Sequence, residues 1–155
     1  MANTYSQVYL HFVFCVKGKQ NLLLSKYNTE LQKYISGIIQ NRNQKLLAIN
    51  NVADHVHILV GFSTTMAIAD FMEEVKSVSS KFINEKGWIK GRFEWQRGYG
   101  VFSYSHSQID NVIKYILAQQ EHHKVQTFKD EYLEFLQNYK VDFNEKYLFD
   151  WIEGL

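Results

Sequence analysis

The chain has one cysteine, no proline and no long hydrophobic run, and each of these absences excludes a class of protein. A single cysteine, Cys15, cannot form an intramolecular disulfide, and it also excludes a cysteine-rich zinc site. No apolar run approaches the roughly 18 residues that a membrane-spanning helix needs. The N-terminus lacks the basic and apolar regions of a signal peptide. We therefore expect a cytoplasmic protein with no membrane partner.

Length and composition favour a single domain. The chain has 155 residues, of which 46% are hydrophobic, enough to build a buried core. Charge is unevenly distributed, because residues 1–125 contain 14 basic and 9 acidic side chains whereas residues 126–155 contain 3 and 7. No linker or repeat separates the two parts, so we interpret 126–155 as an acidic helical extension of the same domain.

Alternation of apolar and polar residues predicts the strands. Tyr5–Val16 alternates along its whole length. Lys45–Asn50 and Ala53–Val60 follow one another closely, which suggests an antiparallel pair. Phe93–Arg97 and Tyr99–Tyr104 predict a hairpin around the glycine between them.

Apolar residues spaced three and four apart predict helices between these strands. The first contains Leu31–Arg42, and the second extends from a cap within Ser63–Thr65 to Gly87. The third begins at Ser107. The last begins at Thr127, where an acidic residue three positions later resembles a capping box.

This order of elements predicts an α+β fold. We expect a ferredoxin-like α/β sandwich with a mainly antiparallel sheet of about five strands and helices packed on its faces. Near the C-terminus, Tyr147, Leu148 and Trp151 are large apolar residues that we expect to dock on the rest of the chain.

Two histidines, His55 and His57, lie in the expected strand Ala53–Val60. Alternate strand residues share a face, so the two imidazoles lie roughly 6.6 Å apart at about 3.3 Å per residue. Side chains at this separation can converge on one divalent ion. Two histidines in this arrangement also occur in structural settings, so the pair alone leaves both interpretations open.

A second polar pair, Tyr115 and Gln119, lies one helical turn apart on the third expected helix. Taken alone, this is an amphipathic helix whose tyrosine borders the core. Taken together, the two pairs form a chemically complete set. His55, His57 and the carbonyl oxygen of Gln119 suit Mn²⁺ and tolerate Mg²⁺ or Zn²⁺, and Tyr115 can attack a phosphodiester.

The two motifs carry a family resemblance. Asp54-His55-Val56-His57, followed by Tyr115-Ile116-Leu117-Ala118-Gln119, resembles the HUH nucleases, named for histidine, hydrophobic residue, histidine. More narrowly, the chain is similar to the single-tyrosine transposases of small bacterial insertion sequences, the TnpA type. Three further segments agree with this family: Tyr9–Phe14, Trp95–Tyr99 and Gln119–His123. The resemblance covers about residues 5–125.

The resemblance implies a complete mechanism. His55, His57 and Gln119 match the ligands of a divalent metal ion, Mg²⁺ or Mn²⁺, and Tyr115 matches the nucleophile. Such enzymes cut single-stranded DNA, leave a 5′-phosphotyrosine and a free 3′-OH, and rejoin strands without a nucleotide cofactor. They recognise DNA hairpins and are homodimers, in which the tyrosine can serve its own chain or the partner. Residues 1–125 are then the catalytic domain.

Five residues are candidate DNA contacts: Lys76, Lys81, Arg92, Arg97 and His122. Basic residues interleaved with aromatics can follow a phosphate backbone and stack bases. The same pattern is also common on an ordinary solvated helix face.

Two alternatives remain open. One is a catalytically silent or domesticated protein of the same fold that binds DNA hairpins, and the other is a palindrome-associated relative of the transposases. A rolling-circle initiator or relaxase is disfavoured, because the chain has no room for a helicase domain.

Overall fold

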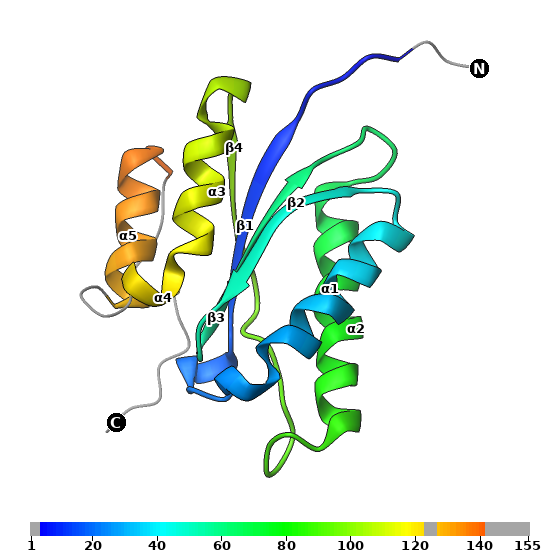
Figure 1. Ribbon diagram of the computed structural model, residues 1–155, viewed down its shortest axis with the longest axis vertical. Coiled ribbons are helices and arrows are strands. Elements are labelled where there is room, and N and C mark those ends of the chain that lie inside the picture. The colour runs from blue at the N-terminus through cyan, green and yellow to red at the C-terminus, as the bar shows by residue number, and fades with distance from the viewer. Residues whose placement is uncertain (1–3, 123–126, 142–155) are drawn as a thin grey trace.

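The structure is a computed structural model that describes residues 4–122 and 127–141. Figure 1 shows a sheet with α1 and α2 on one side and α3, α4 and α5 on the other. The strands are β1 (Tyr9–Cys15), β2 (Lys45–Asn51), β3 (His55–Gly61) and β4 (Gly100–Tyr104). The α-helices are α1 (Asn28–Asn41), α2 (Ile68–Lys86), α3 (Ile109–Leu117), α4 (Gln119–His122) and α5 (Phe128–Asn138). Short 3-10 helices span Lys17–Lys19, Ser25–Tyr27 and His106–Gln108.

The sheet has the strand order β2-β3-β1-β4, and every neighbouring pair is antiparallel. The predicted α+β sandwich is therefore confirmed. The sheet of the described residues has four strands rather than the five expected. β1 begins at Tyr9, later than predicted, and Tyr5 before it is 92% exposed.

The predicted hairpin of Phe93–Arg97 with Tyr99–Tyr104 is wrong. β4 pairs with β1 instead, and Trp95 forms only an isolated bridge to Val16. The backbone of this segment bonds partly to the end of β1, because the Gln96 amide donates to the Cys15 carbonyl and the Lys17 amide donates to the Glu94 carbonyl. A side chain of α2 bonds its first residue. Asn84 accepts from the Phe93 amide at 2.7 Å and donates to its carbonyl at 3.0 Å.

The two central strands, β1 and β3, are buried on both faces. The face toward α1 and α2 carries the larger core, which includes Phe12, Phe14, Val56, Ile58, Ile35 and Phe71. The opposite face carries two smaller clusters. One packs Val13 and Cys15 against Phe128 of α5, and the other packs Leu59 against Ile116 of α3. The smaller clusters leave space on this face for polar side chains.

Helix termini follow the predicted chemistry in part. Gly87 ends α2 in the left-handed region at φ 66°, and Thr127 caps α5 by accepting from the Asp130 amide, both as predicted. α2 begins at Ile68 rather than within Ser63–Thr65, where the hydroxyl groups of Ser63 and Thr65 bond each other. The 3-10 turn before α3 starts with a capping box at Ser105, not at Ser107.

The expected docking of Tyr147, Leu148 and Trp151 lies outside the described residues. Among the helices of residues 4–122 and 127–141, none combines the length and apolar character needed to cross a membrane.

Gly100 of β4 lies close to Tyr132 of α5, so a substitution at Gly100 tests how α5 packs on the sheet. A Cβ at position 100 would lie 2.8 Å from the Tyr132 hydroxyl oxygen. Gly100→Ala should therefore destabilise the protein by about 1–3 kcal/mol, as overpacking does. Chemical denaturation measures this loss.

Gly37→Ala is the matched control, because no atom lies within 4 Å of a Cβ at this position inside α1. It should stabilise the protein by about 0.5–1 kcal/mol through helix propensity. Equal effects of the two substitutions would contradict the packing of α5 on β4.

Candidate active site

His55 and His57 project from β3 toward α3, α4 and α5, and both side chains are fully buried. The prediction that the two imidazoles share one face is confirmed. Their ring centroids lie 5.0 Å apart. The face they share is the one with the smaller apolar clusters, which leaves room for a polar centre.

One nitrogen of each imidazole is oriented by a neighbour. His55 Nδ1 lies 2.7 Å from Asp54 Oδ1, so Asp54 orients this ring. His57 Nδ1 lies 2.8 Å from Nε2 of the buried His11. Burial lowers the pKa of His11 well below its usual value, and the nearby His57 lowers it further. A neutral His11 can accept from Nδ1–H of His57, which leaves Nε2 of His57 facing the site.

Tyr115 and Gln119 are not on one continuous helix, contrary to prediction. α3 ends at Leu117, Ala118 leaves the helical region, and α4 begins at Gln119. The side chain of Asn50 on β2 stabilises this break by donating to the carbonyl oxygens of Ile116 and Leu117. These two carbonyl oxygens have no partner within the helix because α3 ends there, and Asn50 satisfies them. Both Tyr115 and Gln119 still reach the histidines.

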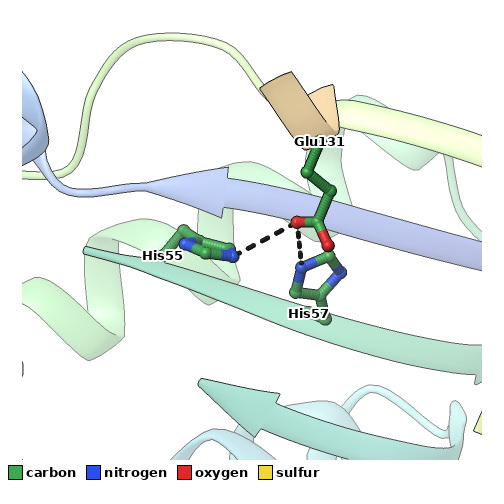
Figure 2. Close-up of side chains that lie close together, drawn as sticks. All are labelled: His55, His57 and Glu131. Atoms are coloured by element: carbon green, nitrogen blue, oxygen red, sulfur yellow. Dashed lines mark hydrogen bonds and ion pairs between the residues drawn. The ribbon is translucent and has the colours of Figure 1, made fainter. Parts of the chain in front are cut away.

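A fifth residue, Glu131 of α5, joins the four predicted ones. Its Oε1 lies 3.1 Å from His57 Nε2 and 3.4 Å from His55 Nε2, the two contacts drawn in Figure 2. Its Oε2 accepts hydrogen bonds from the Tyr115 hydroxyl and from Gln119 Nε2. Gln119 Oε1 in turn lies 3.3 Å from His55 Nε2. Ligand atoms of His55, His57 and Glu131 all lie within 4.8 Å of one another.

This cluster concentrates electron-rich atoms in a buried volume. If Nδ1–H of a neutral His55 donates to Asp54, Nε2 presents a lone pair to the oxygens of Gln119 and Glu131. Burial lowers the pKa of His55, but the Asp54 and Glu131 carboxylates outweigh it and raise that pKa above its usual value. The cluster therefore attracts positive charge, and nitrogen and oxygen donors of this kind suit a divalent metal ion.

Tyr115 lies at the edge of the cluster. Its ring centroid is 6.0 Å from that of His57. Burial, and next the Glu131 carboxylate, raise the pKa of Tyr115 above its usual value. The phenol is therefore protonated at neutral pH in this arrangement. Tyr115 also lines a pocket of about 460 Å³ between α3 and α5, with Asn111, Glu131 and Glu134 among the other lining residues.

Sequence reasoning missed Glu131. A signal was available, because Glu131 falls on the same helical face as Phe128 and Phe135, at spacings of three and four. It is 2% exposed. An acidic residue inside an apolar stripe indicates a buried partner, but the sequence alone does not identify that partner.

Four of the five candidate DNA contacts lie away from the histidines. Lys76, Lys81, Arg92 and Arg97 line one groove between α2 and residues 92–98, on the opposite side of the sheet from the histidines. The ammonium group of Lys76 donates to the carbonyl oxygens of Gln96 and Gly98, so it holds this segment in place. The backbone of His122 lies in α4.

Comparison with known proteins identifies the family. A family described as "Transposase IS200 like" matches residues 4–119. The ISDra2 transposase TnpA of Deinococcus radiodurans is 25% identical over 122 residues, which cover 74% of this chain and 86% of that protein. The transposase for insertion sequence element IS200 of Salmonella typhimurium is 26% identical over 106 residues, 65% of this chain and 70% of that protein.

A solved structure agrees on the fold. The structure of a REP-associated tyrosine transposase bound to a REP hairpin superposes with a TM-score of 0.60 at 13% identity, covering 79% of this chain and 73% of that one. Because the family match spans most of the chain and the fold is shared, the protein belongs to the IS200-like transposase family.

Proposed function

We propose that the protein is a metal-dependent single-tyrosine transposase that cuts and rejoins single-stranded DNA. One observation carries this proposal: the phenol of Tyr115 lies beside a buried cluster in which His55, His57 and Gln119 converge. A nucleophile and a set of metal ligands are the two components that phosphodiester cleavage by tyrosine requires. Membership of a transposase family supports DNA as the substrate.

Each residue has a distinct task in the proposed reaction. His55, His57 and Gln119 hold a divalent ion, Mg²⁺ or Mn²⁺, with His11 and Asp54 fixing the two imidazoles. When bound, the ion withdraws charge from the phosphoryl oxygens. The oxygen of Tyr115 bonds to phosphorus while the bond to the 3′ oxygen breaks. The phenolic proton leaves, the 3′ oxygen takes up a proton, and the products are a 5′-phosphotyrosine and a free 3′-OH.

The geometry favours assembly of the site within one chain. Tyr115 lies at the histidines of its own chain, so no second copy is needed to complete the set of four. The homodimer implied by the resemblance can therefore form without exchanging tyrosines. The pocket between α3 and α5 offers a route for a DNA strand to reach Tyr115.

We further propose that the DNA partner contains a hairpin, as does the ligand of the REP-associated tyrosine transposase. Lys81, Arg92 and Arg97 are exposed in the groove beside α2 and are the candidates for contact with a phosphate backbone. Glutamates line the same groove, and DNA would replace the ion pairs of Lys81 with Glu85 and of Arg92 with Glu94. Lys76 is less suited, because its ammonium group already bonds two carbonyl oxygens.

Removal of the nucleophile tests the chemistry. Tyr115→Phe should give no covalent adduct with a single-stranded hairpin oligonucleotide in Mn²⁺ or Mg²⁺, because the attacking oxygen is absent. Binding of the oligonucleotide should persist. Denaturing electrophoresis detects the adduct, and a mobility shift measures binding. Tyr34→Phe on α1 is the control, since Tyr34 stacks on Phe82 across the sheet from the site. An adduct of unchanged yield in Tyr115→Phe would show that another residue attacks.

Metal removal tests the ligand set. Chelation should abolish adduct formation, and added Mn²⁺ or Mg²⁺ should restore it. Mn²⁺ at about 100 times its dissociation constant should stabilise the folded protein by about 2.7 kcal/mol. The double variant His55→Ala, His57→Ala should show no such stabilisation relative to its own metal-free form. An equal Mn²⁺-dependent shift of the melting temperature in the double variant would place the ion elsewhere.

A further inference from the structure

Glu131 belongs to a part of the chain that the family match does not cover. It lies on α5, whereas the matched segment ends at residue 119. Its side chain is 3% exposed and enters the histidine cluster from the side opposite β3, as Figure 2 shows. A buried carboxylate is costly unless cations or donors compensate it.

The separations between the donor atoms are those expected of ligands that share one metal ion. Two atoms bound to one ion at about 2.1 Å lie about 3.0–3.4 Å apart when they are adjacent in octahedral or tetrahedral geometry. Glu131 Oε1 lies 3.4 Å from His55 Nε2 and 3.1 Å from His57 Nε2. Gln119 Oε1 lies 3.3 Å from His55 Nε2. Glu131 therefore fits the ion as well as the ligand predicted from sequence does.

The second carboxylate oxygen of Glu131 faces the nucleophile. Oε2 accepts from the hydroxyl of Tyr115 and from Nε2 of Gln119. The Gln119 amide has one orientation that serves both contacts, because its nitrogen donates to Glu131 while its oxygen faces His55. Glu131 thus links the metal ligands to Tyr115 through a single side chain.

We propose that Glu131 is a fourth protein ligand of the divalent ion and a positioning residue for Tyr115. Oε1 binds the ion together with His55, His57 and Gln119, and Oε2 holds the phenol beside it. α5 is then part of the active site. The positioning role rests on the proposed function, whereas the ligand role is tested without DNA.

Coordination by four protein ligands would favour Mg²⁺ or Mn²⁺ over Zn²⁺ as the ion that supports the reaction. An octahedral ion such as Mg²⁺ or Mn²⁺ keeps two positions open for phosphate oxygen or water. Zn²⁺ is usually four-coordinate in sites with no open position, so this set would fill its coordination sphere. Zn²⁺ should therefore bind the protein and suppress the adduct that Mn²⁺ supports.

The Mn²⁺ affinity of the full chain tests the ligand role. It is measured in a titration in which electron paramagnetic resonance detects free Mn²⁺. Glu131→Gln keeps the size of the side chain and removes its charge. It should weaken Mn²⁺ binding by at least about ten- to a hundredfold, because mutation of a residue that only supports a metal ligand already lowers metal affinity by that factor. Asp130→Asn, an exposed neighbour on α5, is the charge-matched control and should stay within about twofold. Affinity of Glu131→Gln within about twofold of the unsubstituted protein would overturn the ligand role.

The Mn²⁺-dependent rise in melting temperature separates this role from a structural one. Glu131→Gln weakens the contacts of Glu131 with His55, His57 and Tyr115, so the metal-free variant should melt at a lower temperature than the unsubstituted protein. The rise in melting temperature on adding Mn²⁺ should shrink. Glu131→Asp, which keeps the charge but shortens the reach, should retain part of that rise. An undiminished Mn²⁺-dependent rise in Glu131→Gln would overturn the proposal.

The rate of adduct formation tests the positioning role. At saturating Mn²⁺, Glu131→Gln should form the Tyr115 adduct at least about tenfold more slowly. A faster adduct would overturn this role and show that Glu131 instead occludes the position of the DNA phosphate. If Mn²⁺ binds in a Glu131-dependent manner and no oligonucleotide gives an adduct, the proposed function fails while the ligand role stands.

Discussion

The convergence of buried, electron-rich atoms on one point is the constraint on which the rest of the structure depends. Two imidazole nitrogens, an amide oxygen and a carboxylate meet between β3 and the helices α3 to α5. Such a cluster repels itself unless a cation or shared protons occupy its centre. A divalent ion would satisfy all of the donors together, and the chemistry proposed for Tyr115 rests on such an ion.

The two faces of the sheet differ, and this difference places the polar cluster on one of them. One face of the sheet carries the larger apolar core beneath α1 and α2, which stabilises the domain. The other face carries small clusters and the histidines. Asn50 holds the break after α3, so that Tyr115 and Gln119 approach from one side, while Gly100 lets α5 approach closely from another. The site is assembled from segments far apart in the chain.

Local patterns in the sequence predicted those parts of the site that depend on local geometry. Alternation placed His55 and His57 on one face, and spacing brought Tyr115 and Gln119 together despite the break at Ala118. Such local patterns do not predict contacts between residues far apart in the sequence. Nothing near Glu131 in the sequence indicates the histidines that it meets. The Phe93–Arg97 segment alternates like a strand, but its backbone bonds the end of β1 and the side chain of Asn84 instead of Tyr99–Tyr104.

The most direct test of the account is the position of Mn²⁺ in crystals of the protein, located by anomalous scattering. We predict one strong peak bound by Nε2 of His55, Nε2 of His57, Oε1 of Gln119 and a carboxylate oxygen of Glu131, at bond lengths of about 2.1–2.3 Å. The hydroxyl of Tyr115 should lie beside that ion. A peak that contacts neither imidazole, or no peak at saturating Mn²⁺, would contradict the account.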